Sequence, residues 1–229
     1  MRKAIRRFLQ VLRWPIGIVA LAGLPAALRT VADGVRPMLS TDNWPFWTGL
    51  TAVLLLWFWR WRHARWGRFV TTIEHESLHA IVGMLTLIPV RELKVREDGS
   101  GHVLFEPPGH WLLYLAPYFI PLLLVIEIAL VRLLHLPTTP EQLVYGALIA
   151  LSLLGHLRQV HPRQTDFQHA GRVFTLAFLP TGILLCYGAA FSLLQGGGPE
   201  RWVDFFSAWS NATWRDMMWA FERVNSALT

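Results

Sequence analysis

Thr-Thr-Ile-Glu-His-Glu-Ser-Leu-His-Ala, residues 71–80, is the stretch around which this sequence is organised. It contains the pattern His-Glu-x-x-His at His75, Glu76 and His79. Histidines four residues apart lie on one face of a helix, one turn from each other, so both imidazoles can reach one tetrahedral metal ion. Glu76 stands beside the first histidine, where a carboxylate can serve as the base for an attacking water. The stretch therefore predicts a catalytic metal site.

The composition of the chain is that of a membrane protein. Of its 229 residues 53% are hydrophobic and 16% are charged, and the mean hydropathy is +0.37. The apolar residues gather into long runs, which favours several membrane passes over one large soluble core. The one cysteine, Cys186, lies inside an apolar run and excludes a disulfide framework.

The basic balance of the chain fits a lipid surface. The formal net charge is +6 and the pI is about 10.2, values that in a soluble protein would suggest nucleic acid as a partner. Here the arginines flank apolar runs and alternate with tryptophans, a pattern typical of the headgroup zone of a bilayer. We therefore expect the lipid bilayer as a partner and no nucleic acid.

The first 68 residues are expected to form N-terminal membrane elements. Residues 1–14 are strongly basic, which normally keeps a segment on the cytoplasmic side. The apolar run 15–28 predicts an uncleaved membrane helix or an interfacial helix, and the proline-bearing residues 29–46 predict a loop. A second apolar run, 46–59, should end at residues 60–68, where arginine and tryptophan alternate.

A catalytic core is expected over residues 69–195, beginning with the motif helix. The apolar character of residues 69–89 predicts a helix that ends at Pro89. Alternating apolar and polar residues over 91–105, on both sides of Asp98-Gly99, predict a β-hairpin.

Three further apolar segments follow in the core. Residues 111–134 contain Pro117 and Pro121, which predict a kinked or two-part helix. Residues 143–157 form a short apolar run, and residues 173–194 form the last clear spanning segment.

Residues 200–229 differ from the core in being amphipathic, with large aromatic residues at helical spacing and charges between them. This pattern predicts an interfacial helix in the plane of the membrane, and packing against the bundle is the alternative. The predicted fold class is mostly α: a polytopic membrane helix bundle of five to six membrane elements, with a small β-hairpin and a C-terminal interfacial amphipathic helix. The chain 1–229 is expected to form one domain.

A catalytic zinc site needs three protein ligands and one open position, so a third ligand must lie outside the motif. Asp166, at the expected start of the last spanning element, is the preferred candidate, because a carboxylate that enters an apolar helix needs a cation as its partner. An N-cap or an ion pair with a neighbouring arginine is the alternative role for Asp166. His156, His161, His169 and Glu127 are the other candidate ligands, and for Glu127 an ion pair or a protonated acid is equally compatible.

The order of the spans raises a question of distance. Counting the predicted elements places Asp166 at the membrane face opposite to the start of the motif helix. His79 lies about 15 Å into that helix, near the bilayer midplane. The two residues can meet if the last helix begins before Asp166 or if the proline-broken segment is re-entrant.

With these residues identified, the chain resembles the site-2 protease class of intramembrane zinc metalloproteases, in particular the small bacterial branch without a PDZ domain. The resemblance covers roughly residues 69–185, and four stretches carry it: residues 75–80, 98–101, 115–121 and 164–166. It implies zinc held by His75, His79 and Asp166, with Glu76 as the base. It also implies cleavage of membrane-embedded or membrane-proximal peptide bonds in a protein of the bacterial inner membrane. Ser77-Leu78 stands where members of the class more often have Leu-Gly, and the common Asn-x-x-Pro…Asp-Gly signature around the third ligand is absent.

Two other functions remain compatible with these residues. One is a membrane enzyme of the same motif that uses a glutamate as its third ligand. The other is a non-proteolytic membrane subunit or adaptor that keeps the motif to bind metal or to hold helices together.

Overall fold

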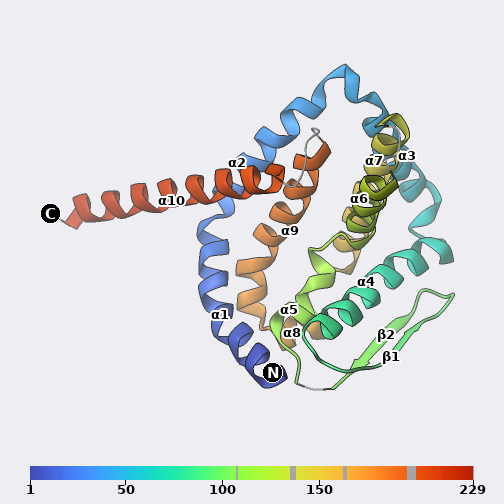
Figure 1. Cartoon of the computed structure of the whole chain (residues 1–229), viewed down its shortest axis with the longest axis horizontal. Helices are drawn as coiled ribbons and strands as arrows, with labels where there is room; N and C mark the ends of the chain where they lie inside the picture. The colour runs from blue at the N-terminus through green and yellow to red at the C-terminus, as the bar shows by residue number, and fades with distance from the viewer. Residues whose placement is uncertain (107, 135–137, 162–163, 195–199, 229) are drawn as a thin grey trace.

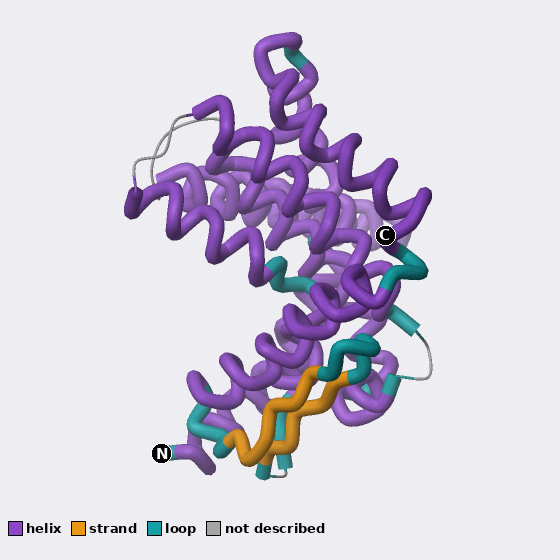
Figure 2. Tube along the Cα trace, turned by 90° about the vertical axis from the view of Figure 1, so that its right-hand side faces the viewer, coloured by secondary structure: helices purple, strands orange, loops and turns teal. Residues whose placement is uncertain are grey.

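The computed structural model describes residues 1–106, 108–134, 138–161, 164–194 and 200–228. Within them the chain is mostly helical, with one two-stranded antiparallel sheet, as the sequence predicted. The helices form a bundle, and the hairpin lies at the end of it that also holds the N-terminus (Figures 1 and 2).

The N-terminal region is more helical than expected. Helix α1 (Arg2–Ala22) is followed after Gly23 by helix α2 (Leu24–Val35), with a bend of 60° between the two. The predicted loop over 29–46 is therefore wrong in its first part, since α2 continues to Val35 and two short 3-10 turns follow it. Pro37 stands in the first turn of a 3-10 helix, a position where its missing N–H costs no hydrogen bond.

Helix α3 (Trp44–Leu56) corresponds to the second apolar run and passes into a π turn at Trp57–Trp61. It packs along helix α7 (Thr138–Gln159). The contact is a close backbone approach, because a Cβ on Gly49 would overlap the carbonyl of Leu143 and a Cβ on Gly146 would overlap that of Phe46. Two glycines thus bring these helices nearer than side chains would allow.

The motif lies on helix α4 (Arg65–Leu85), which begins and ends four residues before the predicted 69–89. Strands β1 (Val90–Val95) and β2 (Gly101–Phe105) then pair with Val95 opposite Gly101 and Val90 opposite Phe105. The predicted hairpin is confirmed. It runs alongside α4 (Figure 1).

The segment with the two prolines is broken, as predicted. Helix α5 (Trp111–Leu115) leads into a 3-10 turn at Ala116–Tyr118, and helix α6 (Leu122–Leu134) leaves at an angle of 75°. Such a pair is either one broken span or a re-entrant loop. Its turn carries Tyr118, which is completely buried.

Three helices complete the chain. The short helix α8 (Thr165–Ala170) lies in a polar segment for which no element was predicted. Helix α9 (Arg172–Leu194) matches the last predicted span and packs on α1 and α2. Helix α10 (Glu200–Leu228) crosses α2 and α9 and extends beyond the bundle, with the C-terminus at its far end (Figure 1).

The described residues contain fewer candidate membrane spans than the five to six elements expected. By length and hydropathy α9 can cross a membrane alone, and the number rises to three if the bent pairs α1–α2 and α5–α6 each count as one span. Helix α3 is too short for the same test, with 13 residues. Helix α4 is long enough but carries charged residues at both its first turn and its motif.

Candidate metal centre

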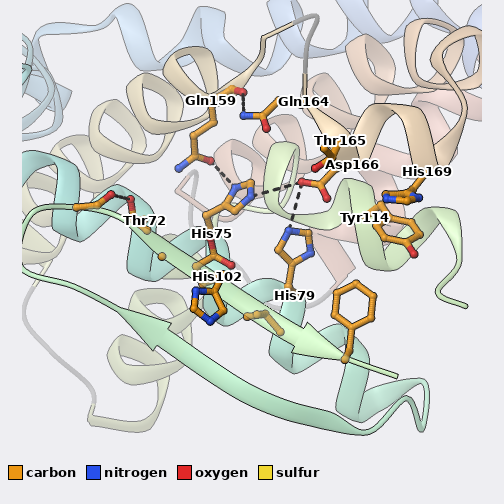
Figure 3. Close-up of a pocket in the computed structure, with 15 residues that line it drawn as sticks. Thr72, His75, His79, His102, Tyr114, Gln159, Gln164, Thr165, Asp166 and His169 are labelled. Atoms are coloured by element: carbon orange, nitrogen blue, oxygen red, sulfur yellow. Dashed lines mark hydrogen bonds and ion pairs between the residues drawn. The ribbon is translucent and has the colours of Figure 1, made fainter. Parts of the chain in front are cut away.

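The two motif histidines of α4 and Asp166 of α8 lie together, with one potential ligand atom from each within 4.8 Å of the others. Asp166 Oδ2 is 3.8 Å from His75 Nε2 and 3.5 Å from His79 Nε2 (Figure 3). Ligand atoms placed 2.0–2.2 Å from a tetrahedral zinc ion are about 3.4 Å apart. The spacing of this His-His-Asp cluster therefore suits a zinc ion with only a small adjustment of the side chains.

Each of the three side chains is held by a partner from a different part of the chain. His75 Nδ1 lies 2.6 Å from Gln159 Oε1, and His79 Nδ1 lies 2.8 Å from the carbonyl oxygen of Leu113. The Tyr118 hydroxyl donates a hydrogen bond of 2.8 Å to Asp166 Oδ2. These contacts fix the orientation of all three groups before any ion is bound.

The contacts also select the protonation state of the histidines. A backbone carbonyl oxygen only accepts, so His79 must carry its proton on Nδ1. Its Nε2 then presents a lone pair toward Asp166, which is the form in which imidazole binds zinc. The donor set and the tautomer together fit zinc.

A cavity of about 620 Å³ opens over the cluster. Glu76 lines it together with the motif histidines, and β2 forms one wall through Gly101, Val103 and Phe105. The wall is mostly polar near the histidines, so water and a peptide group both find hydrogen-bonding partners there.

The hairpin is attached directly to the motif helix. The Thr72 hydroxyl donates to the carbonyl oxygen of Gly99 at 2.9 Å, and Arg68 Nε donates to that of Asp98 at 3.0 Å. Gly99 has a φ of 83°, which favours glycine. A Cβ on Gly101 would lie 2.6 Å from Thr72 Cγ2 and 3.0 Å from Glu76 Cγ, so a glycine lets β2 approach the motif helix α4.

The turn of the hairpin is stabilised from within. The backbone N–H and the hydroxyl of Ser100 both donate to Asp98 Oδ1, at 2.8 and 2.7 Å. These hydrogen bonds hold the pKa of the Asp98 carboxyl below its usual value. The predicted Asp98-Gly99 turn is thus reinforced by the serine that follows it.

The alternative third ligands do not join the cluster of described residues. His169 lines the cavity but stacks on Tyr114, with ring centroids 5.0 Å apart. His156 is buried beside Tyr187, 3.1 Å from its hydroxyl, and His161 lies on the exposed segment that follows α7. Glu127 is buried on α6, where neither carboxylate oxygen has a hydrogen-bond partner.

Asp166 lies on α8, within reach of the histidines, and the last span α9 begins only at Arg172. The expected arrangement in which the last helix begins before Asp166 is therefore wrong. The other arrangement, a re-entrant proline-broken segment, is compatible with the bent pair α5–α6. The N-cap position of α8 belongs to Gln164, so Asp166 is not an N-cap. Arg163, an alternative ion-pair partner for Asp166, lies outside the described residues.

Three residues around the cluster were not singled out from the sequence. Tyr118 and Gln159 hold the predicted ligands, and Glu74 accepts hydrogen bonds from Leu123 N at 3.2 Å and from Ser152 Oγ at 2.9 Å. Only Glu74 gave a sequence signal, as a carboxylate within an apolar helix. Tyrosine and glutamine near helix ends are too common to mark a site.

Of the comparisons with known proteins, only the one with family models finds a match. No curated protein and no solved structure matches the chain. A family model described as Peptidase M50B-like matches residues 48–195, more than half of the chain and the whole of the region that contains the His-His-Asp cluster. The M50 peptidases are zinc-dependent integral membrane proteins of the site-2 protease class. The chain belongs to the Peptidase M50B-like family.

Proposed function

We propose that this chain is an intramembrane zinc metalloprotease of the bacterial inner membrane that hydrolyses peptide bonds of membrane-embedded or membrane-proximal proteins. The observation that carries the proposal is the His75–His79–Asp166 cluster, with Glu76 on the wall of the same cavity. Residues 69–195 would form the catalytic core. Residues 1–68 and the tail 200–229 would fasten it in the membrane.

His75, His79 and Asp166 are the residues that would hold the zinc ion. When bound, zinc supplies a Lewis acid that polarises the scissile carbonyl and lowers the pKa of a water molecule toward about 7. Glu76 accepts the proton of the attacking water and returns it to the leaving amine. Tyr118 keeps the Asp166 carboxylate turned toward the histidines throughout.

The hairpin is the proposed site for the substrate backbone. Within the described chain β2 pairs with β1 alone, and residues of β2 line the cavity. An extended peptide can add to the free edge of such a strand through main-chain hydrogen bonds. This pairing would hold an unwound substrate segment beside Glu76.

The mouth of the site is proposed to face the cytoplasm. Three segments carry clustered basic residues: residues 1–14, 60–68 and 158–172. Arg2 Nη1 pairs with Glu106 Oε2 at 2.7 Å, beside the hairpin, and Arg158 Nη1 donates to the carbonyl oxygen of Arg62 at 3.3 Å. Arg68, in the second of these segments, donates from Nε to the carbonyl oxygen of Asp98 in the hairpin turn. Together the three contacts link the basic segments to the hairpin, and basic segments favour the cytoplasmic face.

Labelling tests this orientation. A Glu97→Cys variant at the exposed hairpin end, in a Cys186→Ser background, should react with a membrane-impermeant maleimide only after the cytoplasmic face is opened. Reaction in intact spheroplasts would contradict it.

Helix α10 is proposed to lie in the membrane interface. Trp214, Met217, Phe221, Val224 and Leu228 follow helical spacing and are exposed. The helix runs across α9 rather than along it (Figure 1). An apolar stripe on a helix that crosses a span faces the headgroup boundary of the bilayer.

The test of the proposed function uses Glu76→Gln in the full-length protein. The variant should retain zinc and lose proteolysis, because the amide keeps the shape of the side chain but cannot accept the proton. Membrane peptides from cells with wild type and with the variant would be compared by mass spectrometry. Identical peptides, or retained biological activity, would instead favour the non-proteolytic adaptor.

A further inference from the structure

We infer that Gln159 is a positioning residue that sets the tautomer of His75 and links it to the segment that carries Asp166. The inference rests on the proposed metal centre and deepens it. Gln159 is the last residue of α7, is half-buried, and lies between the two ligand-bearing elements α4 and α8 (Figure 3).

The orientation of the Gln159 amide is determined by two contacts with α4. Gln159 Nε2 donates to the carbonyl oxygen of Thr71 at 2.8 Å. Since that oxygen only accepts, the NH₂ group must face Thr71 and Oε1 must face His75 Nδ1, 2.6 Å away. His75 must then carry its proton on Nδ1, which leaves Nε2 free to bind the metal.

A third contact reaches the other ligand. The backbone carbonyl oxygen of Gln159 accepts a hydrogen bond of 3.0 Å from Gln164 Nε2. Gln164 stands at the N-cap position of α8, two residues before Asp166. One residue thus fixes the ring of His75 with its side chain and the entry to α8 with its main chain.

Gln159 also differs from the partner of the second histidine. His79 is oriented by a backbone carbonyl, that of Leu113, which no substitution at position 113 removes. A side-chain replacement can therefore remove the hydrogen-bond partner of His75, which is Gln159, but cannot remove the partner of His79. Losing such an outer partner of a metal-binding histidine typically weakens metal affinity by about 10- to 100-fold.

The experiment compares two variants of the full-length purified protein in detergent, with zinc affinity measured by competition against a chromophoric chelator. Gln159→Leu and Gln159→Glu both lose the hydrogen bond to Thr71. Only the glutamate keeps an acceptor for His75 Nδ1. We expect a 10- to 100-fold weaker zinc affinity for the leucine variant and a much smaller loss for the glutamate variant.

Gln142→Leu, near the opposite end of the same helix, is the matched control and should bind zinc as wild type does. The thermal unfolding of the zinc-free variants shows whether each still folds. Equal losses of affinity in Gln159→Leu and Gln159→Glu would reveal a purely structural role and overturn the inference, as would wild-type affinity in Gln159→Leu.

A His75→Ala variant separates this inference from the proposed function. If His75→Ala loses zinc while Gln159→Leu keeps it, Gln159 has no positioning role and the metal centre stands. If His75→Ala binds zinc as wild type does, the metal centre itself is misplaced and both proposals fail.

Discussion

Replacing Tyr118 by phenylalanine removes one hydroxyl group from the metal centre and little else. The ring of Tyr118 is completely buried. Its centroid lies 5.0 Å from that of the His75 ring, in an edge-on arrangement, and 4.6 Å from that of the Phe167 ring. Phenylalanine keeps these ring contacts. The hydrogen bond of 2.8 Å to Asp166 Oδ2 is lost, and the carboxylate becomes free to turn away from the histidines.

The size of the effect follows from the charge on the acceptor. A hydrogen bond to a charged group contributes about 1.5–3 kcal/mol, and each 1.4 kcal/mol corresponds to about tenfold in a dissociation constant. The same hydrogen bond is present in the zinc-free protein, so only part of its free energy is lost from zinc binding. The zinc affinity should therefore fall by at most roughly 100-fold, and we expect a loss of about tenfold.

Chelator competition on the purified full-length protein measures this change. Tyr114→Phe is the matched control, because Tyr114 lines the same cavity but its hydroxyl lies against Gly109 rather than against a ligand. Wild-type zinc affinity in Tyr118→Phe, or an equal loss in both variants, would refute the reasoning that Tyr118 orients Asp166.

Three further predictions concern the scaffold of the site. Gly101→Val should push β2 away from Thr72 and lower the free energy of unfolding by roughly 1–3 kcal/mol through overpacking. Proteolysis should fall as well. Unchanged thermal unfolding and activity would contradict the close approach of β2 to α4. Glu74→Ala leaves the donors Leu123 N and Ser152 Oγ without an acceptor and should lower the free energy of unfolding by roughly 1–3 kcal/mol for each. The loss is measured as a lower unfolding temperature in detergent. An unchanged temperature would show that these two hydrogen bonds do not stabilise the fold. The pKa of Glu106 is held below its ordinary value of 4.5, chiefly by the hydrogen bond from Arg2. The ion pair therefore stabilises the hairpin above pH 4.5, and this stabilisation is lost as the pH falls through the lowered pKa. Hydrogen exchange of the hairpin should show this loss in wild type and not in Glu106→Gln, and identical pH profiles would refute it.

The motif and the hairpin could be predicted from the sequence because both depend on local spacing. Two histidines four residues apart share a helix face whatever surrounds them, and alternation around Asp98-Gly99 specifies a hairpin without any distant contact. The break between Tyr118 and Leu122 was equally local, since a proline such as Pro121 removes a helical hydrogen bond.

Elements that depend on long-range packing were harder to predict. Residues 29–35 carry polar side chains typical of a loop, yet they continue α2 because the helix packs on α9. Helix α8 is only six residues long, too short for any periodic pattern, and its position beside the histidines arises from contacts with α5. Among the described residues one to three helical segments pass the length and hydropathy test for a span, because apolar runs such as 46–59 are shorter than a span. The five to six membrane elements therefore stay a prediction.

The groups that orient the three predicted ligands could not be predicted from the sequence, for the same reason. Tyr118, Gln159 and the carbonyl of Leu113 come from three separate segments, and only the folded chain brings them to the motif helix. Asp166 could be predicted as the third member of the cluster because a carboxylate that enters an apolar helix is costly without a cation. That signal comes from composition and needs no knowledge of contacts.

The zinc K-edge absorption spectrum of the purified full-length protein shows directly which groups bind the metal. For wild type we predict one bound zinc with imidazole nitrogens and a carboxylate oxygen at about 2.0–2.2 Å. For Asp166→Ala we predict loss of the zinc or of the carboxylate contribution. A wild-type spectrum without imidazole scattering, or an Asp166→Ala spectrum identical to that of wild type, would contradict a zinc site formed by His75, His79 and Asp166.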